Sequence, residues 1–407
     1  MFDLLIKNAR FGEAEEPQDI SVSKGLIETI QSKITSSAKQ VFDAENHFLC
    51  SGFFESHIHL DKACILNRST IEEGTLNEAV EETGKAKEKF TEEDVFKRAS
   101  QVVEMAIKKG TMALRTFVET DPKTKLQSFH AIKKVKEKYA FAIDIEICVF
   151  AQEGLTQEKE TQHLLKEALE NGADLIGGCP YKDENPENHI EMIFEMAEKF
   201  DVNVDFHLDF DLDSSNSSIP KISKETLKRN YQGRVSIGHV TKLAAMSKSQ
   251  RQEMKKLLKE ADIALTVLPA TDIFLNGRDH EPLVPRGMVN ANELSEMGIN
   301  TTISSNNILN GFTPYGDASL IRMANMYANV AQLSQDSALL EAYNMITKNA
   351  AKLLNIQTEI KVGKPANFVI LEAKNAVEAV RTISQPLIGF KNGKQTFSNS
   401  KAEIYFN

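Results

Sequence analysis

Four of the nine histidines of this chain stand at the ends of apolar, strand-like runs, where their side chains could do chemistry together. His57 and His59 lie two positions apart in the run 53–59, so on a strand both imidazoles face the same side. His207 and His239 each stand at the end of a later run. Imidazole nitrogens bind Zn²⁺ and Fe²⁺, and three of them leave a position open for water. We therefore predict one divalent metal ion, Zn²⁺ or Fe²⁺, on His57, His59 and His207, with His239 beside it.

The elements that must position these histidines are short apolar runs that alternate with amphipathic, helix-like stretches. The runs are residues 53–59, 112–118, 143–150, 174–179, 202–207, 235–240, 263–268 and 299–304. The helical stretches between them include residues 93–109, 158–171, 187–199 and 249–260. This repeated alternation predicts an α/β fold, a (β/α)₈ TIM-like barrel whose active site lies at the carboxyl ends of the strands. An open doubly wound sheet is the alternative, and the absence of a GxGxxG turn disfavours it.

Both ends of the chain differ from this pattern. Residues 1–50 contain short strand-like runs around turns such as Lys24-Gly25, and the last fifty residues contain similar runs around Asn392-Gly393. We predict one small β-sandwich domain formed by residues 1–50 and 360–407, and a barrel domain formed by residues 51–359.

The composition, 41% hydrophobic and 26% charged, is that of an ordinary globular protein. A formal net charge of −10 argues against a nucleic-acid partner. The alternation of Lys and Glu in residues 85–89 predicts a solvated helix face. The chain has no run of ~20 apolar residues for a membrane span and does not begin like a signal peptide. We therefore expect a cytoplasmic protein that acts on a small molecule, with no membrane or nucleic-acid partner, and a homo-oligomer is compatible with the sequence.

The remaining histidines and the cysteines show no pattern of their own. The four cysteines are far apart and form no CxxC pair, which predicts neither a disulfide framework nor a thiolate zinc site. The other five histidines are interpreted as surface or loop residues: His47, His130, His163, His189 and His280.

Several motifs together resemble the amidohydrolase superfamily, and within it the cytosine deaminase branch. They are residues 55–62, 150–154, 177–180, 205–209, 238–240, 276–278, 285–287 and 363–367. The resemblance implies a metal-dependent hydrolase that cleaves a non-peptide C–N bond in a small cyclic amide or amidine, pyrimidine- or triazine-like. It implies that His57, His59 and His207 bind the metal, that His239 faces the hydrolytic water, and that Gln152 hydrogen-bonds the ring amide. Since the fourth run ends in Cys179 and not in lysine, a binuclear site is not expected.

Two positions depart from the family pattern. The family has an aspartate that shuttles the proton at the end of the eighth strand, and Asn306 stands there in this chain. An amide takes no proton at neutral pH. Cytosine deaminases also carry a glutamate three residues after the fifth-strand histidine, and Phe210 stands at that position. Cytosine itself is therefore not the expected substrate.

The predicted site combines these observations. We predict His239 and Asn306 at the catalytic positions, and Gln152, Asp209, Phe210 and Phe312 as the residues that contact the substrate. Asp61 is a nearby carboxylate that could instead cap the next helix.

Several interpretations stay open on the sequence. The chain is a working hydrolase with a relocated acid/base, a metal-binding relative that has lost catalysis and binds a small molecule, or an engineered Asp-to-Asn variant of an active enzyme. An interaction protein without metal is the remaining option.

Overall fold

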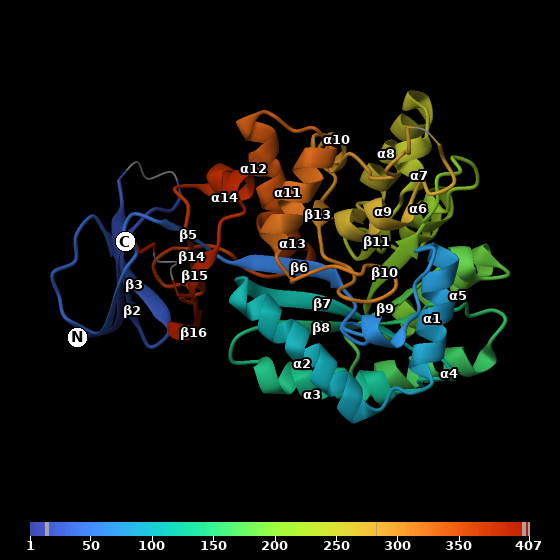
Figure 1. The fold of residues 1–407 in the computed structure, drawn as a ribbon, viewed down its shortest axis with the longest axis horizontal. Helices are drawn as coiled ribbons and strands as arrows, with labels where there is room; N and C mark the ends of the chain where they lie inside the picture. The colour runs from blue at the N-terminus through green and yellow to red at the C-terminus, as the bar shows by residue number, and fades with distance from the viewer. Residues whose placement is uncertain (13–15, 282, 401–403, 406–407) are drawn as a thin grey trace.

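The computed structural model describes residues 1–12, 16–281, 283–400 and 404–405. Figure 1 shows a large barrel beside a smaller β-structured domain, in which elements from both ends of the chain lie together. Among the helices of the described residues, none is both long enough and apolar enough to cross a membrane.

The barrel is an eight-stranded parallel sheet whose strands follow one another in chain order. Its strands are β6 (Phe53–Ile58), β7 (Thr111–Glu119), β8 (Asp144–Ala151), β9 (Leu175–Gly178), β10 (Asn203–Leu208), β11 (Val235–His239), β12 (Ala264–Val267) and β13 (Thr301–Ile303). These are the eight runs predicted from the sequence, and no boundary differs by more than two residues. The sheet closes just beyond β13, where the Asn306 N–H donates to His57 O (2.9 Å) and the His59 N–H donates to Asn306 O (2.8 Å). The closed barrel is thus confirmed.

Helices surround the barrel, most of them on its outer face. They are α1 (Leu76–Lys87), α2 (Glu92–Lys108), α3 (Gln127–Tyr139), α4 (Lys159–Glu170), α5 (Pro186–Phe200), α6 (Ile219–Lys228), α7 (Lys242–Ala245), α8 (Lys248–Glu260), α9 (Pro269–Leu275), α10 (Ala291–Ser295), α11 (Leu320–Val330), α12 (Asp336–Met345), α13 (Lys348–Leu353) and α14 (Ala376–Thr382), with 3₁₀ turns η1 (Leu66–Arg68) and η2 (Pro180–Lys182). Capping side chains fix several starts: Thr91 accepts from the Asp94 N–H at α2, and Ser247 forms a capping box with Gln250 at α8.

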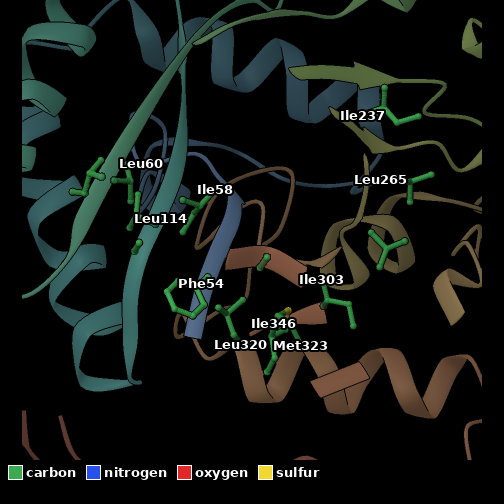
Figure 2. Close-up of a cluster of buried hydrophobic side chains, with 14 of the residues drawn as sticks. Phe54, Ile58, Leu60, Leu114, Ile237, Leu265, Ile303, Leu320, Met323 and Ile346 are labelled. Atoms are coloured by element: carbon green, nitrogen blue, oxygen red, sulfur yellow. The ribbon is translucent and has the colours of Figure 1, made fainter. Parts of the chain in front are cut away.

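The main core lies between the strands and this helical layer. Figure 2 shows Phe54 and Ile58 of β6 and Ile303 of β13 beside Leu320 and Met323 of α11. Because each such aliphatic or aromatic side chain contributes about 1.5–3 kcal/mol when fully buried, this layer holds the strand ends rigidly in register.

The smaller domain consists of two four-stranded sheets. One has the order β3-β2-β1-β4 and the other the order β16-β15-β14-β5. The strands are β1 (Phe2–Ala9), β2 (Gln18–Ser23), β3 (Leu26–Gln31), β4 (Ala38–Asp43), β5 (Phe48–Cys50), β14 (Phe368–Leu371), β15 (Pro386–Lys391) and β16 (Lys394–Ser398). Leu4 and Ile6 from the first end share a core with Phe368 and Phe390 from the second. The predicted β-sandwich from both chain ends is confirmed.

Candidate active site

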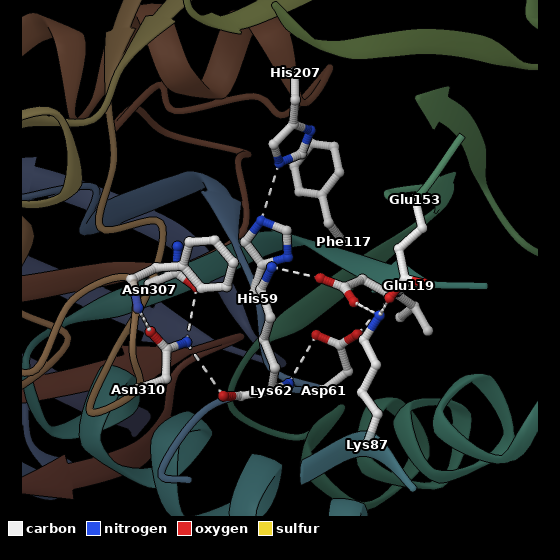
Figure 3. A network of polar contacts seen from close by, with 12 residues as sticks. His59, Asp61, Lys62, Lys87, Phe117, Glu119, Glu153, His207, Asn307 and Asn310 are labelled. Carbon is white, nitrogen blue, oxygen red and sulfur yellow. Dashed lines mark hydrogen bonds and ion pairs between the residues drawn. The ribbon is translucent and has the colours of Figure 1, made fainter. Parts of the chain in front are cut away.

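Three histidines from two strands converge at the carboxyl end of the barrel. His57 lies one residue before the end of β6, His59 lies just beyond that end, and His207 comes from β10. The Nε2 atom of His207 lies 3.1 Å from His57 Nε2 and 3.0 Å from His59 Nε2. All three rings are buried, and their ligand atoms lie within 4.8 Å of one another. Figure 3 shows His59 and His207 facing each other. The structure therefore brings together the residues that were predicted to bind a metal.

The surroundings of this triad favour uncharged imidazoles. Burial lowers the pKa of His57, His59 and His207 well below the ordinary value, and neighbouring positive groups lower it further. Phe117 lies 4.0 Å from the His57 ring, and Phe150 stacks on His207 at 4.7 Å between ring centroids. Three neutral nitrogens that face one point are the donor set of a divalent cation with an open coordination position, so these residues fit the predicted metal.

A second group of side chains stands beside the triad at the ends of β11, β12 and β13. His239 Nδ1 lies 2.7 Å from Asp272 Oδ1, while the Leu268 N–H donates to Asp272 Oδ2 at 3.1 Å. The Nδ2 atom of Asn306 lies 3.4 Å from His239 Nε2 and 3.0 Å from Thr271 Oγ1. This arrangement connects the two predicted catalytic positions to a buried carboxylate.

Backbone conformation and a glycine help to bring these groups close. His239 and Asn306 have φ values of 69° and 62°, in the left-handed region that non-glycine residues seldom occupy. A Cβ atom on Gly238 would lie 2.8 Å from His57 Cε1, so only glycine lets β11 approach the His57 ring. Such local strain is common where a site must hold side chains in one geometry.

A cavity opens onto His59 and His207 of the triad and onto His239. Gln152 and Lys62 line it, and Phe210, Phe312 and Leu275 add an apolar cluster to its wall. The Phe210 ring stands edge-on to His239, 4.5 Å between centroids. Of the predicted substrate contacts, Gln152, Phe210 and Phe312 therefore share one cavity with His59, His207 and His239.

The two aspartates considered from the sequence point elsewhere. Both Asp209 oxygens accept hydrogen bonds from the following loop, from the Ser217 hydroxyl at 2.5 Å and the Ser218 N–H at 3.1 Å. Asp61 accepts the backbone N–H of Lys62 and of Glu119, each at 2.8 Å. The structure thus places Asp209 against the loop before α6 and away from the residues that line the cavity, and it places Asp61 where it holds two strand ends together.

An ionic cluster supports the first half of the barrel mouth. Glu119 at the end of β7 pairs with Lys62 at 2.5 Å and with Lys87 of α1, and Lys87 also contacts Asp121 at 2.9 Å and Glu153 at 3.0 Å. Figure 3 shows Lys62 and Lys87 meeting at Glu119. Burial opposes the charge of Glu119, but the two ammonium groups outweigh it and lower the pKa of Glu119 to about 2.

Two interpretations of the sequence were wrong here. Lys87 belongs to the helix face that was predicted to be solvated, yet it is only 3% exposed because carboxylates from other loops neutralise it. His189 is not a surface residue: it is completely buried, with Nδ1 2.8 Å from Asp183 Oδ2.

Some site residues could not be found from the sequence. Asp272 was missed because an acid in the first turn of a helix is ordinarily a surface residue that complements the helix dipole. Tyr181 and Lys182 also line the cavity and lie just after β9, where their position past a strand end is the signal that could have found them.

Comparison with known proteins defines the class of protein. Residues 92–394 match the amidohydrolase family model. The chain is 27% identical to the N-isopropylammelide isopropyl amidohydrolase of Pseudomonas sp. strain ADP, over 97% of this chain and 96% of the relative. It is 24% identical to the pterin deaminase of Rhizobium rhizogenes, over 92% and 87%. The crystal structure of 5-methylcytosine deaminase from Klebsiella pneumoniae liganded with 5-fluorocytosine covers 99% of both chains with a TM-score of 0.93 at 26% identity.

The chain belongs to the amidohydrolase family. This confirms the resemblance that the motifs around His57, His207 and His239 indicated. The protein is accordingly an amidohydrolase-type enzyme, a hydrolase of carbon–nitrogen bonds other than peptide bonds.

Proposed function

We propose that this enzyme hydrolyses a C–N bond in a small cyclic amide or amidine, pyrimidine- or triazine-like, with one Zn²⁺ or Fe²⁺ ion. The observation that carries the proposal is the convergence of three buried, uncharged imidazoles on one point beside His239. A divalent metal held by His57, His59 and His207 supplies a hydrolytic water whose pKa is lowered towards neutrality.

The protein residues around the cavity suit such a substrate. Gln152 offers both a donor and an acceptor, which matches the adjacent N–H and C=O of a cyclic amide. Phe210 and Phe312 offer apolar surface for a ring or for a substituent on it. The relatives whose names state a substrate act on ring systems of this kind, which supports the same substrate class. We assign Asp209 to holding the loop before α6 and not to substrate contact.

Metal content tests the proposal directly. Protein produced in medium supplemented with zinc or iron is expected to retain one ion per chain in elemental analysis, and His207→Ala is expected to lose it. His163→Ala is the matched control, because His163 is exposed on α4 and should leave the metal content unchanged. Turnover is then measured on a panel of cyclic amides and aminopyrimidines. Wild-type protein without metal, or equal metal in all three forms, would contradict the proposal.

A second candidate function is favoured by one observation, the amide at Asn306. A metal-binding relative without turnover would serve as a small-molecule binding protein, and an engineered Asp-to-Asn change would give the same chemistry. Binding of panel compounds without hydrolysis, by a protein with full metal content, would support this alternative.

We also propose that the enzyme works in the cytoplasm, that residues 1–50 with 360–407 and residues 51–359 form its two domains, and that it forms a homo-oligomer. Fractionation of the producing cells, limited proteolysis and light scattering test these three points.

A further inference from the structure

We propose that Asp272 is a positioning residue that makes His239 the proton acceptor of this enzyme, in place of the carboxylate that Asn306 lacks. The inference rests on the proposed function, because it names the group that would move the proton in that hydrolysis. It concerns a residue that the sequence motifs did not indicate.

Asp272 is placed so that it can fix the orientation of His239 through one ring nitrogen, Nδ1. Asp272 is completely buried at the start of α9, and its Oδ1 lies 2.7 Å from His239 Nδ1. Its other oxygen, Oδ2, is fixed by the backbone N–H of Leu268 at 3.1 Å. A carboxylate can only accept at Oδ1, so the proton of a neutral His239 must reside on Nδ1. The Nε2 lone pair then faces the cavity.

Asn306 selects the same tautomer from the other side of the ring. Its Nδ2 lies 3.4 Å from His239 Nε2 and 3.0 Å from Thr271 Oγ1, so the amide can donate to the Nε2 lone pair. An unprotonated aspartate at position 306 would instead place a carboxylate oxygen next to the Nε2 lone pair, and neither of these two acceptors could donate a hydrogen bond. Asp272 and Asn306 therefore act on opposite nitrogens, and both leave Nε2 as a base.

His239 and Asp272 together can account for both proton transfers of the hydrolysis. As the water oxygen bonds to the substrate carbon, one water proton passes to His239 Nε2 in place of the Asn306 contact. The resulting imidazolium is stabilised by its hydrogen bond to the Asp272 carboxylate. His239 then donates this proton to the leaving nitrogen as the C–N bond breaks, and the ring returns to its starting tautomer.

The tautomer is measured first, by nitrogen-15 NMR of the full chain with labelled histidines, both metal-free and supplied with Zn²⁺. His239→Gln identifies the His239 signals. Wild type is expected to show the proton on Nδ1. In Asp272→Asn the amide oxygen keeps the Leu268 N–H, so the amide NH₂ faces Nδ1 and the proton is expected to move to Nε2. Asp183→Asn is the matched control, since it changes a separate buried Asp–His pair and should leave His239 unchanged.

The second measurement is a double-mutant cycle with D272N and N306D on a compound that the panel identifies. In the wild-type background, D272N is expected to lower turnover by roughly 10²-fold or more. In the N306D background, where the new carboxylate is a second proton acceptor, D272N is expected to lower turnover by about tenfold or less. The proposal is overturned if His239 carries its proton on Nε2 in wild type, if D272N leaves the tautomer unchanged, or if D272N costs the same in both backgrounds. Because the tautomer is read without turnover, a failure of the proposed function would not hide the result.

Discussion

The two halves of the barrel mouth are held together by different forces. In the half formed by β6–β9, Glu119 lies between the buried ammonium groups of Lys62 and Lys87. In the half formed by β10–β13, the polar contacts beside the triad are hydrogen bonds such as His239–Asp272 and Asn306–Thr271, next to an apolar cluster around Phe210, and the Lys242–Asp211 ion pair of this half involves a half-exposed carboxylate. The first half is therefore the ionic half, and the second is the hydrogen-bonded half.

This difference indicates that the ionic half supports the structure and that the hydrogen-bonded half carries out the reaction. A buried ion pair fixes geometry but leaves a costly charge if one partner is removed. The hydrogen-bonded half contains groups that can exchange a proton at the cavity, and both departures from the family pattern, Phe210 and Asn306, lie there. Changes in the ionic half should thus affect stability first, and changes in the hydrogen-bonded half should affect turnover first.

The largest effect is expected from Glu119→Gln. It leaves the buried ammonium groups of Lys62 and Lys87 without their shared carboxylate, so unfolding should become easier by about 3–5 kcal/mol. Glu153→Gln is the matched control. Glu153 also pairs with Lys87, but its side chain is 37% exposed, and the expected loss is about 1 kcal/mol or less. Denaturant unfolding at neutral pH measures both, and equal losses would show that the buried Glu119 pairs do not hold the ionic half together.

Asn306→Asp is expected to raise turnover by roughly 10²-fold, because its carboxylate adds a second proton acceptor beside the His239–Asp272 pair, which an amide cannot do. Stability should change much less than in Glu119→Gln. Initial rates on the panel, at equal metal content, give the comparison. Fast turnover by wild type with no gain in the variant would show that the His239–Asp272 pair already suffices.

The sequence predicted the strands of both halves and the histidine triad, but not the buried contacts that hold the two halves in place. Buried parallel strands carry continuous apolar runs, so the eight strands are visible locally, and so are the histidines at their ends. Lys87 and Asp272 could not be placed in this way. The local sequence pattern of a Lys/Glu helix is the same whether its lysine faces water or the distant Glu119. Only the closed barrel brings Lys87 next to Glu119. The same holds for His189, whose burial depends on the bare backbone of Gly178 beside it.

Acid pH should weaken the ionic half in a defined window. The pKa of Glu119 is lowered from an ordinary 4.5 to about 2, because Lys62 and Lys87 outweigh its burial. The contribution of Glu119 to stability is therefore complete above about pH 4.5 and is lost as the pH falls towards 2, with an expected size of about 1–3 kcal/mol. Unfolding midpoints from pH 6 to pH 2.5 should fall more steeply in wild type than in Glu119→Gln. Parallel curves would contradict this assignment.

The smallest effect is expected where the two halves meet, at Phe312. Its ring lies under the Lys62 ammonium, 4.3 Å from Nζ to the centroid, and packs in the same apolar cluster as Phe210. Phe312→Leu removes this cation–π contact in addition to ring volume, whereas Phe210→Leu removes ring volume and the edge contact with His239. Replacing one large apolar side chain by another usually costs below about 1.5 kcal/mol, and a desolvated cation–π contact adds about 0.5–2 kcal/mol. Phe312→Leu should therefore lower the free energy of unfolding about 1 kcal/mol more than Phe210→Leu does. This difference of about 1 kcal/mol between the two variants should largely disappear when each substitution is made separately in a Lys62→Met background, because the cation is then absent. If the difference persists there, Phe312 supports the barrel mouth by packing alone.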